Sequence, residues 1–206
     1  MRFQPPIDHQ GAKAQAGDKH DNRIMALLFR FSVSQMAMIR AVRRPGARSR
    51  GWLIAGPAQI PVALGRSGIA ANKREGDGAT PRGSFRLVRL WWRADRLPRP
   101  RTLLPTQRIG PGDAWSEDPN DRRYNRAVKR KAEEPGDRLW RTDQLYDLII
   151  ELDHNTRPRV AGRGSAVFVH VARPGFGPTA GCIALERKRL HWLLSRIGPK
   201  TRIVIQ

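Results

Sequence analysis

Cysteine is almost absent from this sequence: Cys182 is the only one in 206 residues. A single thiol excludes an intrachain disulfide and a zinc site built on several cysteines, so cysteine content does not identify the compartment of the protein. Two uses remain for Cys182. It either packs as a small apolar residue or acts as a nucleophile.

Long apolar runs are also lacking. Residues 24–39 are the most apolar stretch near the N-terminus, but Arg30 interrupts them and the run is too short to span a bilayer. No small-residue cleavage site follows cleanly, so this stretch is only a weak export segment. The residues before it are polar and lack apolar periodicity, which favours disorder. We therefore expect residues 1–50 to be a disordered extension, or an upstream extension of a chain that starts at Met36 or Met38.

Acidic residues are outnumbered: 39 Lys and Arg against 18 Asp and Glu give a net charge of +21. Such a charge attracts nucleic acid, anionic lipid head groups or an acidic cell-envelope polymer. A nucleic-acid module is the rival hypothesis, with four tryptophans available for stacking: Trp91, Trp92, Trp115 and Trp140. The sequence contains no helix-turn-helix, zinc-finger or RNA-binding signature, so we expect no nucleic-acid partner.

The pattern from residue 51 onwards is that of a mainly β protein. Two short apolar runs, 51–56 and 59–65, flank Gly56-Pro57 and predict a hairpin. Residues 83–92 alternate as a half-buried strand does. Further strand candidates are residues 145–152, 165–171 and 201–205.

One helix is predicted in the C-terminal region, over residues 186–197. Leu190, Leu193, Leu194 and Ile197 share one of its faces, and Gly198-Pro199 ends it. Residues 94–144 are rich in Pro, Arg, Asp and Asn. A compact domain rarely carries so long a connection without purpose, so we expect a functional loop or lid there within one domain of residues 51–206.

Cys182 follows His170 closely. Alternation along residues 165–171 places Phe168 and His170 on the same face of a strand, and the Gly/Pro-rich residues after it turn the chain back toward the strand end. A thiol with an ordinary pKa of about 8.5 needs a neighbouring base to react at neutral pH. Gly181 would leave its own N–H group and that of Cys182 free to stabilise an oxyanion. A packed cysteine and a structural histidine remain the alternative on these residues alone.

Three motifs in order strengthen the enzyme hypothesis. An opening hairpin is followed by T-P-x-G-x-F at Thr80 to Phe85, and G-C-I-x-L begins at Gly181 after His170. Over residues 51–206 this order resembles the YkuD-type L,D-transpeptidase catalytic domain. The resemblance implies a YkuD-like β-sandwich with a long loop or lid insertion. It also implies that Cys182 attacks the carbonyl of an L-to-D bond in a peptidoglycan stem peptide, forming a thioacyl-enzyme.

The other roles follow from the same resemblance. His170 would take the thiol proton and later activate the acceptor amine, while the N–H groups of Gly181 and Cys182 would hold the oxyanion. The family needs no cofactor or metal, acts in the bacterial periplasm and is inhibited by carbapenem-type β-lactams. We expect a monomer. Hydrolysis of the same stem peptides, by an L,D-carboxypeptidase or amidase, is the alternative because it shares the thioacyl-enzyme.

Two positions depart from the usual family pattern. The family reads S/T-H-G-C where this chain has Ala180 before Gly181, and G-C-I-R where it has Ala184; the spacing from His to Cys is also shorter. The segments GRGSAVFVH and TAGCIAL look like an alpha- and betaproteobacterial branch. That branch is associated with crosslinks from the first-position L-alanine of one stem to diaminopimelate of another.

Several polar residues are candidates for binding the stem peptide. Arginine forks suit carboxylates, and amide or hydroxyl groups suit peptide bonds. The candidates are Arg163, Ser165, Arg173, Thr179, Tyr124, Asn125 and Asn155. Solvated surface positions and loop-bracing hydrogen bonds are the alternative roles. We do not expect His154 to bind a metal, because no second ligand lies at a suitable spacing.

Overall fold

Strands make up most of the regular structure in the computed structural model, which describes residues 35–131, 134 and 136–206. The strands are β1 (Met38–Arg43), β2 (Arg50–Ala55), β3 (Ala58–Ala63), β4 (Ile69–Ala70), β5 (Thr80–Pro81), β6 (Gly83–Trp92), β7 (Thr106–Arg108), β8 (Asp113–Trp115), β9 (Ala127–Lys129), β10 (Asp137–Arg138), β11 (Leu148–Leu152), β12 (Phe168–Val171), β13 (Ile183–Leu185) and β14 (Arg202–Ile205). A 3-10 turn, η1 (Pro174–Phe176), and an α-helix, α2 (Arg187–Leu194), complete the described elements. The predictions of a mainly β fold and of a helix in the C-terminal region are confirmed.

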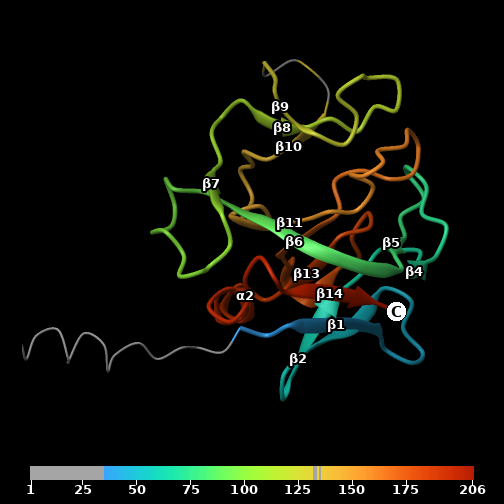
Figure 1. Cartoon of the computed structure of the whole chain (residues 1–206), viewed down its shortest axis with the longest axis vertical. Helices are drawn as coiled ribbons and strands as arrows, with labels where there is room; N and C mark the ends of the chain where they lie inside the picture. The colour runs from blue at the N-terminus through green and yellow to red at the C-terminus, as the bar shows by residue number, and fades with distance from the viewer. Residues whose placement is uncertain (1–34, 132–133, 135) are drawn as a thin grey trace, which may run out of the picture. The chain divides into compact units, whose positions relative to one another are not determined.

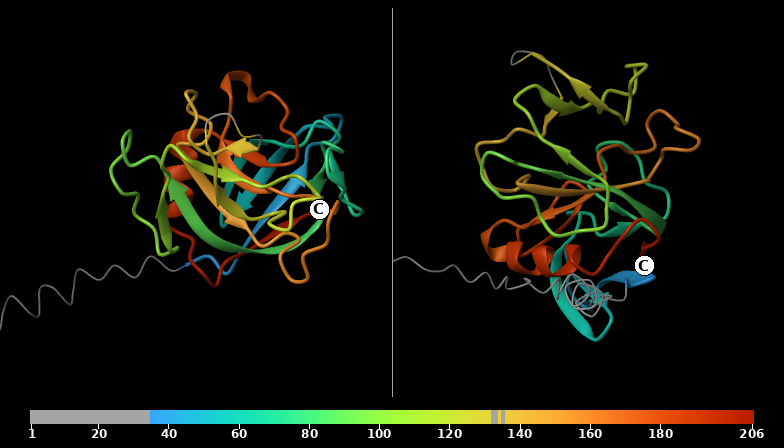
Figure 2. Two further views of the ribbon diagram at one scale, coloured as in Figure 1. Left: turned by 90° about the horizontal axis from the view of Figure 1, so that it is seen from above. Right: turned by 60° about the vertical axis from the view of Figure 1, so that its left-hand side comes forward.

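The largest sheet closes on itself. Its strands follow the order β11-β12-β13-β3-β2-β1-β14-β6-β7, and a further pairing joins β11 to β6. The long strand β6 makes this closure possible, because its first residues pair with β14 and its later ones with β11. Figures 1 and 2 show the strands curving round a common interior. The two layers of the expected β-sandwich are thus connected by strand pairing into one closed sheet.

The domain begins before residue 51, where the sequence pattern placed its start. Strand β1 pairs antiparallel with β2 and parallel with β14, and its residues Ile39 and Ala41 are buried. The expected extension therefore contains a central strand, which Arg40 and Arg43 concealed by interrupting its apolar pattern. Most of the expected export segment 24–39 lies outside the described residues.

The interior of the closed sheet holds the main core. Val167 and Val169 point into it from the segment around β12, and Ile183 and Leu185 do so from β13. The predicted apolar face of α2 also packs there, through Leu190, Leu193, Leu194 and Ile197. Among the described residues, no helix is long and apolar enough to cross a membrane.

Residues 94–144, here called the cap, add β7 to the edge of the main sheet and place a small three-stranded sheet on its outer face. The central strand of this small sheet, β8, pairs with β9 and β10. The indole of Trp115 meets the ring of Phe168 edge-on, with the ring centroids 5.0 Å apart, and lies 6.5 Å from that of Trp91. These aromatic contacts bury a second core against β6 and β12. The predicted insertion therefore has a fold of its own and packs against the main sheet.

Candidate active site

Strands β12 and β13 bring His170 and Cys182 to the same face of the sheet. They pair in parallel, with His170 opposite Ala184 and Val169 opposite Ile183. Cys182 and Phe168 belong to the outer core under the cap, whereas Val169 and Ile183 belong to the interior. The predicted alternation of the residues of this strand between the two faces of the sheet is confirmed. Cys182 and His170 line one pocket of about 150 Å³.

The thiol of Cys182 is held by the backbone at the start of β12. Its Sγ donates to the carbonyl oxygen of Ala166 at 3.1 Å and accepts from the N–H of Phe168 at 3.4 Å. Ala166 has a φ of +50°, a conformation that is costly for alanine. This strained peptide unit aims the carbonyl at the thiol and so orients the S–H bond at rest, and that bond must turn before the thiol can give its proton to a base.

His170 is oriented by its own strand. Its Nδ1 lies 2.9 Å from the carbonyl oxygen of Val171. Because a carbonyl can only accept, Nδ1 carries the proton, and the lone pair of the neutral ring is on Nε2. The phenol ring of Tyr146 packs edge-on against the imidazole, with 5.2 Å between centroids. The ring is thus fixed in the tautomer that a general base requires.

Burial keeps both groups neutral at rest. It lowers the pKa of His170 to about 4 and raises the pKa of the Cys182 thiol to about 12. Cys182 is 8% exposed and His170 is 7% exposed. A pair with these values exists as thiol and imidazole, not as thiolate and imidazolium. The proton must therefore leave the thiol as the new bond to sulfur forms.

The T-P-x-G-x-F motif supports the loop that carries the nucleophile. The buried hydroxyl of Thr80 accepts the N–H of Gly65 at 2.8 Å, and Gly65 forms a β-bridge with Thr179. The carbonyl of Ala79 lies directly against Gly181, where a Cβ would approach it to 2.8 Å. Thr80 of the motif therefore supports the Cys182 loop through Gly65, and Ala79, just before the motif, contacts it directly.

Thr179 organises the turn before Cys182. Its hydroxyl donates to the carbonyl of Cys182 at 2.6 Å and accepts the N–H of Gly181 at 3.1 Å. The Gly181 N–H that we expected to hold an oxyanion is therefore bonded to Thr179 in this structure. Substrate would have to displace that hydroxyl before Gly181 could serve as a donor.

We expect Gly181→Ala to disable the Cys182 loop. The φ of Gly181 is +149° and a Cβ would lie 2.8 Å from the Ala79 oxygen, so alanine is both strained and blocked. Strain of this kind costs about 1–3 kcal/mol, and displacement of the thiol should lower its rate of acylation roughly 10²-fold. Urea unfolding and acylation by a carbapenem measure the two effects.

The matched control is Gly177→Ala in the same segment. Gly177 lines the same pocket as Cys182, but its φ is −56° and nothing lies within 4 Å of the added Cβ, so alanine is neither strained nor blocked there. Equal effects of the two substitutions would show that the special geometry of Gly181 is unimportant.

A buried polar cluster lies beside the pocket. The Lys73 ammonium donates to Asp77 Oδ1 at 2.5 Å and to the carbonyl of Arg74 at 2.8 Å. Its side chain passes between Gly164 and Gly181, with Cε 3.5 Å from where a Cβ of Gly181 would be. Burial, followed by the charges of Asp137 and Glu75, raises the pKa of Glu117 to about 7. The cluster thus places the Lys73 ammonium among several carboxyl groups near Cys182.

The cap also contributes to the pocket wall. Tyr146, just after the cap, donates its hydroxyl to Asp137 Oδ2 of β10 at 2.8 Å. Burial raises the pKa of the Tyr146 phenol well above its usual value, so the phenol stays protonated. The guanidinium of Arg141 lies 5.1 Å from the same ring. The pocket wall against His170 is therefore built from Tyr146 and from Arg141 at the end of the cap.

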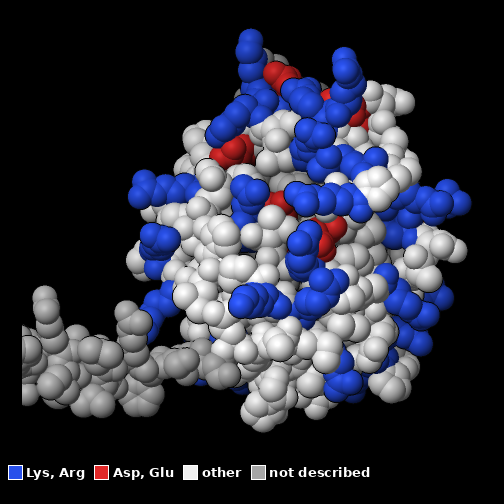
Figure 3. Space-filling view, viewed as in Figure 1, with Lys and Arg blue, Asp and Glu red and all other residues white. Residues whose placement is uncertain are grey.

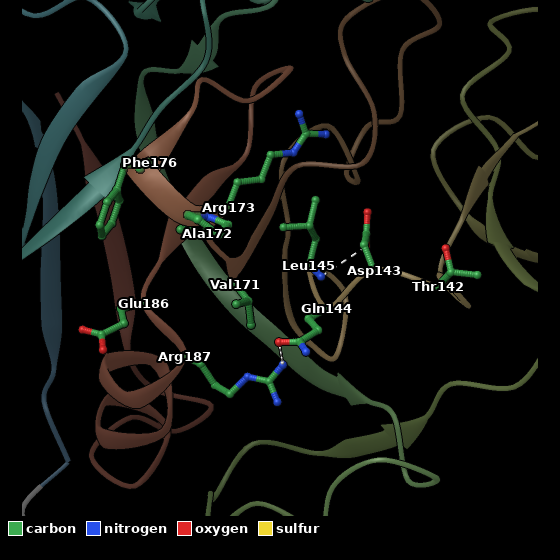
Figure 4. A pocket seen from close by; sticks show the side chains of 12 residues that line it. Thr142, Asp143, Gln144, Leu145, Val171, Ala172, Arg173, Phe176, Glu186 and Arg187 are labelled. Carbon is green, nitrogen blue, oxygen red and sulfur yellow. Dashed lines mark hydrogen bonds between the residues drawn. The ribbon is translucent and has the colours of Figure 1, made fainter.

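A larger groove adjoins the catalytic pocket, with a volume of about 960 Å³ (Figure 4). Three segments line it: residues 142–145, residues 171–176 and the start of α2 at Glu186 and Arg187. Leu145 and Arg173 line both cavities. The two spaces are consequently neighbours with a shared wall.

The structure brings only some of the predicted binding residues to the pocket. Arg173 and Thr179 line it together with Cys182 and His170. Arg163 and Ser165 do not: Arg163 is exposed, and Ser165 is buried beside the Tyr124 phenol. Neither Arg163 nor Ser165 is therefore placed to contact a substrate in this pocket.

Tyr124, Asn125 and Asn155 brace loops. Tyr124 donates to Glu75 Oε2 at 2.5 Å. Asn125 donates to the carbonyls of His154 and Asn155 and accepts the N–H groups of Trp115 Nε1 and Ala166. Asn155 donates to the carbonyls of its own loop. These three residues hold the cap and the strand entry together and do not line the pocket.

Sequence reasoning missed Tyr146, Arg141 and Lys73. Tyr146 was visible only as the start of an apolar run, and Arg141 and Lys73 as two of many basic residues. Their positions depend on how the cap and the Lys73 turn pack against the sheet, which no local pattern encodes. The described residues contain no group of three His, Cys, Asp or Glu side chains that could hold a metal ion.

Comparison with known proteins identifies the domain. Residues 42–205 match the family model described as the YkuD L,D-transpeptidase catalytic domain. No curated protein matches the sequence.

Similar solved structures include an L,D-transpeptidase from Mycobacterium smegmatis (13% identity, TM-score 0.38), which covers 82% of this chain and 58% of that one. L,D-transpeptidase 1 from Mycobacterium tuberculosis (14%, 0.35) covers 82% and 61%. L,D-transpeptidase 3 from the same organism, in complex with a faropenem-derived adduct (13%, 0.38), covers 82% and 60%. The chain thus spans about three fifths of the length of these proteins. With the family model matching most of its length, the chain belongs to the YkuD family of L,D-transpeptidase catalytic domains.

Proposed function

We propose that this protein is a cysteine L,D-transpeptidase that crosslinks peptidoglycan stem peptides. The observation that carries the proposal is the pair formed by Cys182 and His170. Both line one small pocket on one face of the sheet, and the imidazole has its lone pair on Nε2. A shielded thiol beside a neutral imidazole suits acyl transfer through a thioester.

The first half of the reaction acylates the enzyme. Cys182 passes its proton to Nε2 of His170 as sulfur attacks the carbonyl carbon of the L-to-D bond. His170 then returns the proton to the departing amine, which leaves a thioester on Cys182. The backbone N–H of Gly181 is the candidate oxyanion donor once Thr179 releases it.

The second half releases the product. An amine of a second stem attacks the thioester carbonyl and gives its proton to His170 Nε2. The C–S bond breaks, and the imidazolium protonates the departing sulfur, so Cys182 and His170 return to their resting forms. Because His170 is neutral at rest, it can accept a proton in both halves.

The proposed substrate places the protein outside the cytoplasmic membrane, in the bacterial periplasm. The surface is consistent with an anionic polymer: the net charge is +21, and basic side chains cover much of the face in Figure 3 with few acidic ones between them. We propose no nucleic-acid partner. β-Lactams should acylate Cys182, as the faropenem-derived adduct of the mycobacterial enzyme suggests.

The crosslink that we propose joins the first-position L-alanine of one stem to diaminopimelate of another. Ala184 lies opposite His170 and lines the pocket, and Ala180 lines it too. Their methyl groups stand where the family usually has Arg and His, so the pocket must hold its donor differently. The altered chemistry of these two positions supports a donor other than the usual one.

We expect purified protein incubated with muropeptides to give dimers joined from L-alanine to diaminopimelate. Tandem mass spectrometry of the isolated dimers identifies the linkage. Dimers joined only between two diaminopimelates would refute the proposed crosslink while supporting transfer. Shortened monomers without any dimer would instead indicate a hydrolase.

A further inference from the structure

We propose that a cavity lined by Arg43, Arg48 and Arg82, here called the arginine pocket, binds a carboxylate of the peptidoglycan polymer and so docks the protein on the cell wall. The inference rests on the polymer named in the proposed function. The arginine pocket has a volume of about 450 Å³ and shares no lining residue with the catalytic pocket. It is therefore a second, separate site.

The protein does not neutralise the positive charge of the arginine pocket. Within the part of the chain that the structure describes, the side chains of Arg43, Arg48 and Arg82 form no hydrogen bond or ion pair, and no lining side chain is acidic. Gln206 also lines the cavity, and three guanidinium groups against its terminal carboxylate still leave two positive charges unmatched. Like charges that share one cavity repel each other, and a bound anion relieves that repulsion.

The backbone around the arginine pocket holds two of the three arginines against one segment, residues 65–70. Gly68 has a φ of +83°, and an added Cβ would lie only 3.3 Å from Arg48 Cγ, so the Arg48 side chain packs across this turn. The N–H of Arg82 donates to the carbonyl of Ala70 at 2.8 Å. The cavity is thus formed before a ligand arrives, which lowers the entropic cost of binding.

The ligand class follows from the guanidinium groups. Their planar forks match a carboxylate in a bidentate arrangement. Peptidoglycan stem peptides carry carboxylates at intervals along the polymer, so one stem can occupy the arginine pocket while another reaches Cys182. Figure 3 shows Lys and Arg side chains along the edge of the molecule where β4 and β5 lie, next to this cavity.

The arginine pocket is also connected to the nucleophile loop. The N–H of Arg66 donates to the carbonyl of Thr179 at 2.9 Å, and Gly65 forms a β-bridge with the same residue. The N–H of Thr80 donates to the carbonyl of Gly68 at 2.8 Å. Residues 65–70 therefore support both the arginine pocket and the loop that precedes Cys182, so a polymer held at the first is kept near the second.

The test removes the charge of the arginine pocket. The variant Arg43→Gln/Arg48→Gln/Arg82→Gln keeps polar side chains at three exposed positions. The three single substitutions are measured as well, so that a folding defect of the triple variant leaves the test in place. The rate of acylation by a carbapenem reports whether the catalytic centre is intact, and we expect it to stay within about twofold of wild type.

The matched control removes the same charge elsewhere. Arg101, Arg122 and Arg189 are exposed, and their side chains form no hydrogen bond or ion pair within the described residues. They line neither the arginine pocket nor the catalytic pocket. The triple glutamine variant of these residues therefore measures the effect of net charge alone.

Binding is measured by cosedimentation of the full-length protein with purified sacculi that have been treated with hydrofluoric acid to remove phosphodiester-linked polymers. We expect the apparent Kd to rise at least about tenfold in the arginine-pocket variant, because charge-assisted hydrogen bonds are lost. The control should change by less than about twofold, since diffuse surface charge is screened by salt. Converting the carboxylates of the sacculi to amides should weaken wild-type binding to a similar extent and leave the arginine-pocket variant unchanged.

Three results would overturn the assignment. Equal losses in the arginine-pocket variant and the control would mean that diffuse charge binds the wall. Wild-type binding that is insensitive to amidation would exclude a carboxylate ligand. Tighter binding to a DNA duplex than to sacculi, lost in the arginine-pocket variant, would assign the cavity to nucleic acid. Failure of the proposed function is seen separately, as the absence of crosslinked dimers from soluble muropeptides.

Discussion

Cys182→Ala should abolish turnover and leave the fold unchanged. Alanine fits the space of the buried side chain and removes only the sulfur, whose partners are backbone groups of Ala166 and Phe168. Cys182→Ser should be nearly inactive, since a hydroxyl is a much weaker nucleophile beside a neutral imidazole. Mass analysis of muropeptide products, with circular dichroism as the folding control, tests both variants. Substantial product from either one would rule out the thiol mechanism.

The wild-type thiol gives a related signature. Burial raises its pKa to about 12, so at any pH below that value less thiolate is present than for an ordinary cysteine. The rate of alkylation by iodoacetamide should therefore increase as the pH rises from 7 to 9, about tenfold per unit. A plateau near pH 8.5 would show an unperturbed thiol.

His170→Gln should lower kcat/KM by about 10²–10⁴, the usual effect of losing a positioned general base. Glutamine keeps a polar side chain in the pocket but cannot take the thiol proton. In wild type the imidazole becomes protonated only near its lowered pKa of about 4. The acid limb of the pH profile should consequently lie near pH 4, and it should vanish in the variant.

His191→Gln is the control for this measurement. His191 lies on α2 and does not line the catalytic pocket. We expect its activity and pH profile to match wild type. If His170→Gln and His191→Gln behaved alike, His170 would not be the base.

Local patterns in the sequence predicted those parts of the fold that short-range physics determines. Alternation identified β6 residue for residue, and the Gly56-Pro57 turn identified the hairpin of β2 and β3. The 3.6-residue repeat identified the apolar face of α2. Strand β1 was not predicted because its exposed arginines interrupt the apolar pattern. Its place in the sheet follows only from its pairing with β14, which is distant in the sequence.

The candidate site was predictable to a similar extent. His170 and Cys182 could be related because the Gly/Pro-rich residues between them turn the chain back toward the strand end, and the parallel pairing of β12 with β13 shows how the fold does this. The pocket wall could not be predicted, because Tyr146 and Arg141 reach it through the docking of the cap. The roles of Asn125 and Asn155 as braces likewise depend on contacts between segments that are distant in the chain.

Asn125 makes the cap inseparable from the nucleophile. The N–H of Ala166 donates to Asn125 Oδ1 at 3.2 Å, and the carbonyl of the same residue accepts the thiol proton of Cys182. The backbone of Ala166 thus connects the cap to the sulfur of Cys182. Its N–H binds the cap and its carbonyl binds the thiol. A chimera that replaced the cap with a plain linker would keep Cys182 in sequence but lose the contact that positions Ala166. A chimera in which another segment replaces residues 94–144 should therefore be inactive, unless that segment supplies an equivalent of Asn125 to bind the Ala166 N–H.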